Sequence, residues 1–205
     1  MPSTLPTRRA LALLLAAALG ACSDATSRPS PSPTAPAPAD SAMALFNFDG
    51  SDAADWFVVN DGVMGGDSRG RLETEGGALV FTGELVTEGG GFTSARVERG
   101  ADLSAFDGLE ARVRGGGRTF ELEVNDATRN RQREVSRRAP FPTTADWRTV
   151  RVGFADLDAT AFGEPVDAGP LDRAGVESFG FFIADGQDGP FRLEVDWVRP
   201  YADGP

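Results

Sequence analysis

The amino-acid sequence predicts an all-β protein, an antiparallel β-sandwich of the jelly-roll type. Apolar and charged residues alternate over short stretches such as Phe120–Val124 and Phe191–Trp197, a pattern that buries one face of a strand and leaves the other in water. Clusters of glycine at 65–66, 76–77, 89–91 and 115–117 separate these stretches and supply turns. No long stretch has the periodicity of an amphipathic helix. Short alternating strands between glycine turns are typical of a sandwich.

The strands are expected within a single domain at residues 43–202, a usual size for one hydrophobic core. We expect about ten short strands, bounded by turn residues, at 44–48, 56–59, 78–85, 92–97, 109–114, 120–124, 131–138, 147–154, 178–184 and 191–197. The stretch from 155 to 176 is the least regular. A turn or a short helix is expected there, near 171–175.

The N-terminal 42 residues differ in composition from the rest. Two arginines precede an apolar run at 10–19, which is too short to span a bilayer and is typical of a secretion signal. Leu19–Cys22 resembles the lipobox of bacterial lipoproteins, in which the cysteine is acylated and the preceding peptide is removed. We therefore expect a signal peptide at 1–21 and, at 22–42, the lipidated Cys22 followed by a disordered linker rich in proline, serine and alanine. An ordinary signal peptide with an accidental cysteine is the alternative.

Charge and composition exclude several kinds of chemistry. The formal net charge is −11, and removal of residues 1–21, which hold two arginines and no acidic residue, leaves −13. So acidic a chain is a poor partner for nucleic acid. The sequence has no histidine and no lysine, which excludes a histidine base, histidine metal ligands and a lysine Schiff base. With Cys22 modified, no thiol remains for catalysis or zinc binding.

The most unusual stretch is Trp56–Ser68, WFVVNDGVMGGDS. Asn-Asp-Gly favours a turn because these residues tolerate positive φ, and the following pair of glycines allows a close backbone approach. Met64 is a flexible apolar side chain between the two turns. Some thirty residues on, the segment 90–96, GGFTSAR, places Phe92, Ser94 and Arg96 on one face of a strand.

Together these stretches resemble the complex I intermediate-associated protein 30 family. Weaker similarities extend along the domain in the same order, at Phe46–Asp49, Phe81–Leu85, 102–109, Phe141–Thr144 and 189–198. The resemblance implies a galactose-binding-like jelly roll, similar to some carbohydrate-binding modules, with no assigned catalytic residues. Mitochondrial members of the family assist assembly of respiratory complex I. The signal and linker distinguish this chain from those members.

Two groups of residues are candidates for ligand binding. The first is the loop of Asn60, Asp61, Met64 and Ser68 with Arg96 nearby, where polar groups and one adaptable apolar side chain suit a peptide or the edge of a glycan. The alternative is a loop that only packs against the neighbouring strand.

The second group is a charged face on two strands. We expect Arg112 and Arg114 on one strand to lie beside Glu121, Glu123 and Asn125 on the next. Such a face suits sugar hydroxyls, although aromatic stacking groups are scarce, and the alternative is cross-strand ion pairing on a solvated face. Alternation also puts Glu121 and Glu123 on one side, as the carboxylate pair of a retaining glycosidase requires. Asn125 interrupts that pattern.

A structural cation and a basic surface are further possibilities. Asp49 near the first strand and Asp196 in the last strand would supply carboxylates for calcium where the ends of a jelly roll meet. Arginines at 129, 131, 133, 137 and 138 form a local cationic stretch, which suits an anionic surface or protects an edge strand from pairing with other chains.

These observations predict a non-catalytic binding domain on a membrane-anchored lipoprotein. The preferred function is recognition of a protein partner, with assembly of a membrane complex as the function that the family resemblance implies. The alternatives are a carbohydrate-binding module and a jelly-roll glycosidase. The chain is expected to be exported and held through its lipid on a bacterial membrane, the outer membrane facing the periplasm or the cell surface. No cofactor is expected apart from the structural calcium.

Overall fold

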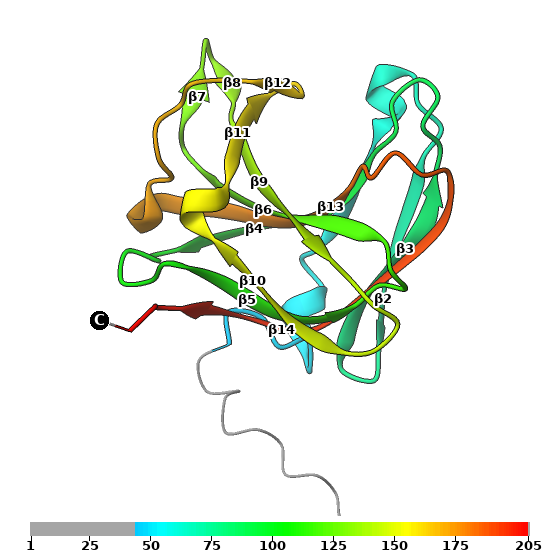
Figure 1. The fold of residues 1–205 in the computed structure, drawn as a ribbon, viewed down its shortest axis with the longest axis horizontal. Coiled ribbons are helices and arrows are strands. Elements are labelled where there is room, and N and C mark those ends of the chain that lie inside the picture. Colours follow the sequence, from blue (N-terminus) through cyan, green and yellow to red (C-terminus); the bar gives the residue numbers. More distant parts are fainter. Residues whose placement is uncertain (1–43, 205) are drawn as a thin grey trace, which may run out of the picture. The chain divides into compact units, whose positions relative to one another are not determined.

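A computed structural model describes residues 44–204 of the chain (Figure 1). The predicted signal peptide, the lipidated Cys22 and the linker lie outside the described residues. Helical structure in the described part consists of short 3-10 turns, at Ser51–Ala53 (η2), Asp61–Met64 (η3), Phe154–Asp156 (η4) and Arg173–Gly175 (η5). None of the helices between residues 44 and 204 has the length and apolar character needed to cross a membrane.

One of the two main sheets has seven strands, and all its pairings are antiparallel. Its spatial order is β1 (Phe57–Asn60), β4 (Thr93–Ala101), β13 (Val176–Ile183), β6 (Thr119–Asp126), β9 (Ser136–Pro142), β11 (Asp158–Ala161) and β12 (Glu164–Pro165). A separate two-stranded hairpin consists of β7 (Arg129–Asn130) and β8 (Arg133–Glu134). In the chain it lies between β6 and β9.

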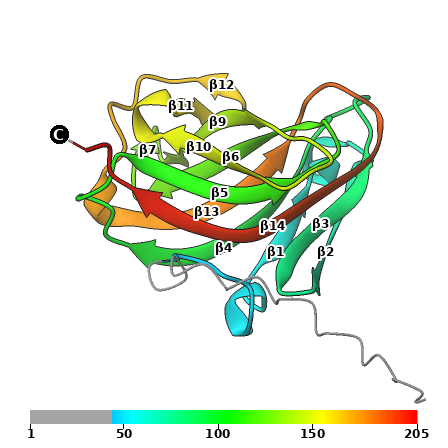
Figure 2. The ribbon, with the colours of Figure 1, turned by 60° about the horizontal axis from the view of Figure 1, so that its bottom comes forward.

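The other sheet has five strands, also paired antiparallel. Its order is β10 (Arg148–Gly153), β5 (Gly108–Arg114), β14 (Gly189–Tyr201), β3 (Ala78–Leu85) and β2 (Arg69–Glu75). Figure 2 shows the long strand β14 running beside β5 along this sheet. Because β4, β5 and β6 alternate between the two sheets, the chain crosses repeatedly from one layer to the other. The predicted antiparallel sandwich is confirmed.

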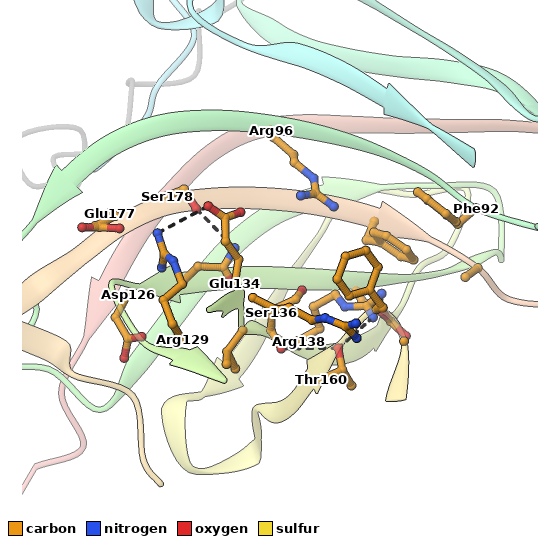
Figure 3. Close-up of a pocket in the computed structure, with 18 of the residues that line it drawn as sticks. Phe92, Arg96, Asp126, Arg129, Glu134, Ser136, Arg138, Thr160, Glu177 and Ser178 are labelled. Atoms are coloured by element: carbon orange, nitrogen blue, oxygen red, sulfur yellow. Dashed lines mark hydrogen bonds and ion pairs between the residues drawn. The ribbon is translucent and has the colours of Figure 1, made fainter. Parts of the chain in front are cut away.

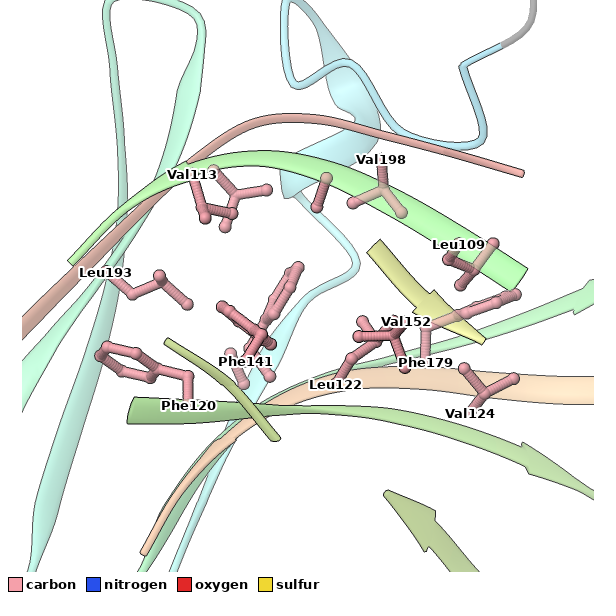
Figure 4. Close-up of a cluster of buried hydrophobic side chains, with 14 of the residues drawn as sticks. Leu109, Val113, Phe120, Leu122, Val124, Phe141, Val152, Phe179, Leu193 and Val198 are labelled. Atoms are coloured by element: carbon pink, nitrogen blue, oxygen red, sulfur yellow. The ribbon is translucent and has the colours of Figure 1, made fainter. Parts of the chain in front are cut away.

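The hydrophobic core lies between the two sheets (Figure 4). Leu109 and Val113 of β5 and Leu193 of β14 come from one layer, while Phe120 of β6 and Phe179 of β13 come from the other. All five side chains are at most 2% exposed. The alternation seen in the sequence therefore has its expected cause, since the inner positions of each strand are buried and the outer ones carry charge.

The predicted strands agree with the structure in most places and differ in others. The stretch 44–48 forms a single bridge, from Phe46 to Val198. The stretch 131–138 is divided between β8 and β9, because Arg131 and Gln132 have positive φ (49° and 68°) and form the turn of the β7–β8 hairpin. Strands β2, β7, β11 and β12 were not predicted, and the last two lie in the stretch from 155 to 176 that was expected to be irregular. The short helix expected near 171–175 is present as η5.

Candidate functional site

A groove of about 920 Å³ lies on the outer face of the seven-stranded sheet (Figure 3). Strands β4, β13, β6 and β9 supply its floor, through residues such as Arg96, Ser178, Glu121 and Arg138. Met64 of η3 lies on one bank. The opposite bank comes from the β7–β8 hairpin and from Phe162, in the turn between β11 and β12.

The floor of the groove is held by a polar network centred on Glu123. The Glu123 side chain is only 2% exposed, its carboxylate accepts a hydrogen bond from Ser136 Oγ, and its oxygens lie 3.5 Å from Arg96 Nε and 3.8 Å from Arg138 Nε. Arg138 also donates to Glu121 at 2.9 Å. These bonds join three strands, so the charged groups of the floor are fixed before any ligand arrives.

Asn125 continues the same row of the sheet. Its Nδ2 donates to Ser178 Oγ at 3.2 Å, and its Oδ1 accepts from the Arg137 backbone N–H at 2.9 Å. Both ends of the amide are therefore in use, and its orientation is fixed. This row of Glu121, Glu123 and Asn125 lies on one face, as the alternation predicted.

Aromatic rings accompany the arginines in the groove. Phe92 and Phe182 are stacked, with ring centroids 5.1 Å apart and planes inclined by 12°. The Arg138 guanidinium lies 4.0 Å from the Phe182 ring centroid, and the Arg133 guanidinium lies 4.7 Å from that of Phe162. Such stacking limits the freedom of long arginine side chains and places flat apolar surface beside charge.

The bank that carries Met64 is held in place by Asp61, which is fully buried. One oxygen of its carboxylate accepts from the Ser68 N–H at 3.0 Å. The other accepts from Ser68 Oγ at 2.7 Å, from the Gly91 N–H at 2.8 Å and from the Phe92 N–H at 3.2 Å. One side chain thus joins η3, the start of β2 and the segment before β4.

Gly66 and Gly90 leave space for the Asp61 side chain because they have no Cβ. A Cβ on Gly66 would lie 2.2 Å from Asp61 Cγ, and one on Gly90 would lie 2.7 Å from Asp61 Cβ. Asn60 completes the arrangement, because its Oδ1 accepts from the Gly70 N–H at 2.9 Å and from Thr93 Oγ1 at 2.6 Å. In the first predicted group, therefore, Asn60, Asp61 and Ser68 are bonded inside the protein.

The other two members of that group face the groove. Met64 is 60% exposed. Arg96 lines the floor and donates from Nε to Ser94 Oγ at 2.9 Å. The loop was predicted as one binding element, whereas the structure divides it into a buried support and two groove residues.

Two carboxyl groups near the groove have shifted pKa values in opposite directions. Burial alone raises the pKa of Asp61, but the hydrogen bonds from Ser68, Phe92 and Gly91 outweigh it and hold that pKa below its usual value. Burial raises the pKa of Glu121, and the repulsion of Glu123 adds to this effect. The attraction of Arg138 opposes both without cancelling them.

The predicted charged face that combined β5 with β6 is wrong. Strand β5, with Arg112 and Arg114, belongs to the five-stranded sheet, while β6, with Glu121 and Glu123, belongs to the seven-stranded sheet. The sequence shows only that each strand has a polar face, and adjacent strands of a jelly roll commonly lie in different layers.

The two arginines instead pair with β14. Arg112 bonds to Asp196, and Arg114 donates to Glu194 at 2.6 Å. Both guanidiniums lie within 5 Å of the Trp147 ring centroid, at 4.9 and 4.8 Å. These groups are therefore engaged with one another on the outer face of the five-stranded sheet.

The two residues proposed for calcium have other surroundings in the structure. Asp196 bonds to Arg112, and an Asp49 oxygen lies beside Gly77 at the β2–β3 turn. Among residues 44–204, no group of three or more acidic or thiol side chains gathers in a geometry that would hold a metal ion. Calcium binding stays a prediction that these contacts do not support.

The arginine stretch is also divided. Arg129, Arg133 and Arg138 line the groove, but Arg137 points to the interior, is 2% exposed, and donates to the carbonyls of Ala168 and Gly169 at 3.1 and 2.8 Å.

Sequence reasoning missed Phe162 and Phe182 as groove residues. Phe182 has no distinctive signal because it follows another buried phenylalanine, whereas Phe162 before Gly163 marks an exposed apolar residue in a turn.

Comparisons with known structures agree with the fold. A family 11 carbohydrate-binding module from Clostridium thermocellum, in complex with a β-1,3-1,4-mixed-linked tetrasaccharide, is 15% identical, with a TM-score of 0.59 over 78% of this chain and 95% of that one. An agarase, AgWH50C, is 12% identical, with a TM-score of 0.55 over 79% of this chain and 26% of that one. At these identities the likeness concerns the fold alone.

Comparison of the sequence with known proteins identifies the family of the chain. The mouse (Mus musculus) protein named complex I intermediate-associated protein 30, mitochondrial, is 29% identical over 175 residues, which are 74% of this chain and 53% of the mouse protein. The chain thus spans about half the length of that relative. Residues 46–195 match the family described as Complex I intermediate-associated protein 30 (CIA30), and the chain belongs to that family.

Proposed function

We propose that this protein is a non-catalytic binding protein whose groove recognises a protein partner. The observation that carries the proposal is the position of its exposed apolar side chains. Among residues 44–204, the exposed large hydrophobic residues are Phe57, Met64 and Phe162, and the latter two lie on opposite banks of the groove, 60% and 74% exposed. A single exposed apolar residue is ordinary, but two that flank one groove suit the anchors of a protein interface.

The floor supports recognition better than hydrolysis. Glu123 is buried in bonds to Ser136 and the two arginines, and Glu121 shares Arg138 with it. A glycosidase of the retaining type needs one carboxylate free to attack and the other free to donate a proton. Here the two acids fix the floor, which suits a surface that binds and leaves its ligand intact.

The family adds a candidate for the partner. The mouse relative is named for an intermediate of complex I, and we propose an assembly-factor-like role on a membrane complex. We further propose that lipid on Cys22 holds the chain on the exported side of a bacterial membrane, so that the partner would be a membrane protein exposed there. The lipobox and the proline-rich linker support this location.

A glycan is the second candidate ligand. It is favoured by two polar groups that the floor holds in fixed positions, the guanidinium of Arg138 stacked on Phe182 and the amide of Asn125. Retention of the protein in an affinity gel that contains mixed-linked β-glucan would favour this ligand. Recognition of a protein predicts no retardation in that gel.

The test of the proposed function is a cross-linking pull-down of the full chain from detergent-solubilised membranes, in which the amount of the recovered partner is measured. Met64→Ala with Phe162→Asn removes both anchors; asparagine is chosen because residue 162 has a φ of 55°. We expect recovery to fall about tenfold or more, as for the loss of interface anchors. Phe57→Ala, the control, removes an exposed ring outside the groove. Equal recovery by the double variant, or release of sugar from β-glucans by the wild type, would refute the proposal.

A further inference from the structure

Arg137 and Asp126 form a buried ion pair where strand β6 ends and strand β9 begins. Their side chains are 2% and 1% exposed, and Arg137 Nε lies 3.6 Å from the Asp126 carboxylate. Removing two charges from water offsets most of the gain from their attraction, so such a pair adds little net stability. It does fix the directions of its hydrogen bonds, because a guanidinium and a carboxylate are planar groups with several bonding positions.

These hydrogen bonds reach two segments of the chain. Asp126 Oδ1 accepts from the Thr128 N–H at 2.9 Å, at the base of the β7–β8 hairpin. Its Oδ2 accepts from the Asp172 N–H at 2.7 Å, and Arg137 donates to the carbonyls three and four residues before Asp172. Residues 166–172 belong to no strand or helix. The ion pair thus supplies hydrogen-bond partners that a sheet would otherwise supply.

Both segments belong to the side of the groove that carries Phe162. Residues 166–172 directly follow the β11–β12 hairpin, whose turn contains Phe162. The Arg133 guanidinium of the β7–β8 hairpin lies against the Phe162 ring, at 4.7 Å from its centroid. We call the two hairpins and residues 166–172 together the Phe162 bank. The two hairpins are therefore joined at two places, at the Arg133–Phe162 contact beside the groove and through the buried ion pair.

We infer that Asp126 and Arg137 are positioning residues, whose ion pair holds the Phe162 bank in place and so keeps Phe162 across the groove from Met64. Pairing with β9 holds strand β11, and the ion pair holds the base of the β7–β8 hairpin and residues 166–172. Because Phe162 is an anchor of the proposed interface, the part of this role that concerns binding depends on the proposed function.

Hydrogen exchange of backbone amides in the full chain, read by mass spectrometry, tests the positioning role. Arg137→Lys keeps the charge but has no planar fork to bond two carbonyls at once. We expect peptides that cover 127–135 and 162–172 to exchange about tenfold faster or more, while those of β5 and β14 keep their rates. A pair that only stabilised the fold would change the rates in all these peptides, because they would exchange through global unfolding.

Arg118 offers a matched control. It pairs with Asp185 at 2.6 Å and also donates to two backbone carbonyls, those of Gln187 and Pro190. It precedes the start of β6, whereas the Arg137 pair lies at the end of that strand, and it does not line the groove. Arg118→Lys should leave exchange of the Phe162 bank unchanged. In the cross-linking pull-down, Arg137→Lys should lose partner and Arg118→Lys should retain it.

Thermal melting identifies a variant that fails to fold. If Arg137→Lys does so, Asp126→Asn replaces it, because it removes an acceptor from the same pair, and Asp185→Asn becomes its control.

The outcomes separate the two proposals. Unchanged exchange in the Phe162 bank, or a rise that is equal in all peptides or equal in the control variant, would overturn the positioning role and leave recognition of a protein intact. Faster exchange confined to the bank, together with loss of the partner, supports both. Faster exchange confined to the bank with full recovery of the partner would support the positioning role and contradict the groove as the binding site.

Discussion

At the scale of single residues, the family motif is explained by one carboxylate. Asp61 accepts four hydrogen bonds from Ser68, Gly91 and Phe92, and it is fully buried. Sequence alone predicted this residue as part of a binding loop. The structure shows that it supports the loop, and that Met64, three residues later, is the member exposed to the groove.

Replacement of Asp61 by asparagine tests that role. The amide NH₂ cannot accept a hydrogen bond, so up to three donors would lose their acceptor. We expect the free energy of unfolding to fall by about 2–3 kcal/mol, measured by urea denaturation. The side-chain methyl signal of Met64 in the NMR spectrum should also shift, because its bank loses its support. Asp67→Asn is the control, since the Asp67 side chain is 80% exposed. A stable variant with an unchanged Met64 signal would contradict this account.

At the scale of elements, strand positions were predictable but their assignment to sheets was not. Strand β3 has the predicted bounds, Ala78–Leu85, because its buried side chains and its flanking glycines are both visible in the sequence. Strand β2, Arg69–Glu75, was missed because six of its seven residues are charged or polar or glycine, with Leu72 as the only large apolar side chain. Pairing with β3 across the Gly76–Gly77 turn forms it.

The connection between η3 and β2 gives a prediction at this scale. Gly66→Ala would place a methyl group 2.2 Å from Asp61 Cγ, whereas a Cβ at Gly62, in the same turn, meets nothing within 4 Å. We expect Gly66→Ala to lower the free energy of unfolding by about 1–3 kcal/mol, the usual cost of overpacking. Gly62→Ala should change it little. Chemical denaturation of the two variants compares them directly, and equal midpoints would show that the close approach is not required.

At the scale of the whole molecule, charge is organised as networks across the sheet faces. On the outer face of the five-stranded sheet, Glu110 bonds to Arg151 and Arg199, and Glu194 bonds to Arg114 and Arg192. Each carboxylate thus meets two guanidiniums from different strands. Because the chain contains arginine and no lysine, these planar cations can pair and stack at the same time.

The pH dependence of stability follows from the buried acids. Burial raises the pKa values of Asp61, Asp126 and Asp185, but hydrogen bonds hold all three below their usual range in the folded state, and Arg137 and Arg118 add to this effect at Asp126 and Asp185. Their stabilisation is present above the unfolded pKa of about 4 and is lost as pH falls through the lower folded values. With no histidine in the chain, we expect the Tm to be nearly constant from about pH 6 to 8 and to fall steeply below about pH 4.

Thermal melts across this range, in buffers of constant ionic strength, measure the effect. Asp185→Asn removes one of these acids and its pair with Arg118, so the variant should be less stable at neutral pH and lose less stability on acidification. A steep change of Tm between pH 6 and 8 would mean that a different group controls stability.

The sequence by itself determined the sandwich and which residues share a strand face, because alternation is a local property of the chain. It thereby placed Glu121, Glu123 and Asn125 on one face. Only the tertiary structure decided that Arg112 and Arg114 belong to the opposite layer, and that Phe92, Phe182 and Phe162 meet around one groove. These relations join residues far apart in the sequence. They depend on which strands pair, and pairing is set by the packing of the whole core, which no local pattern contains.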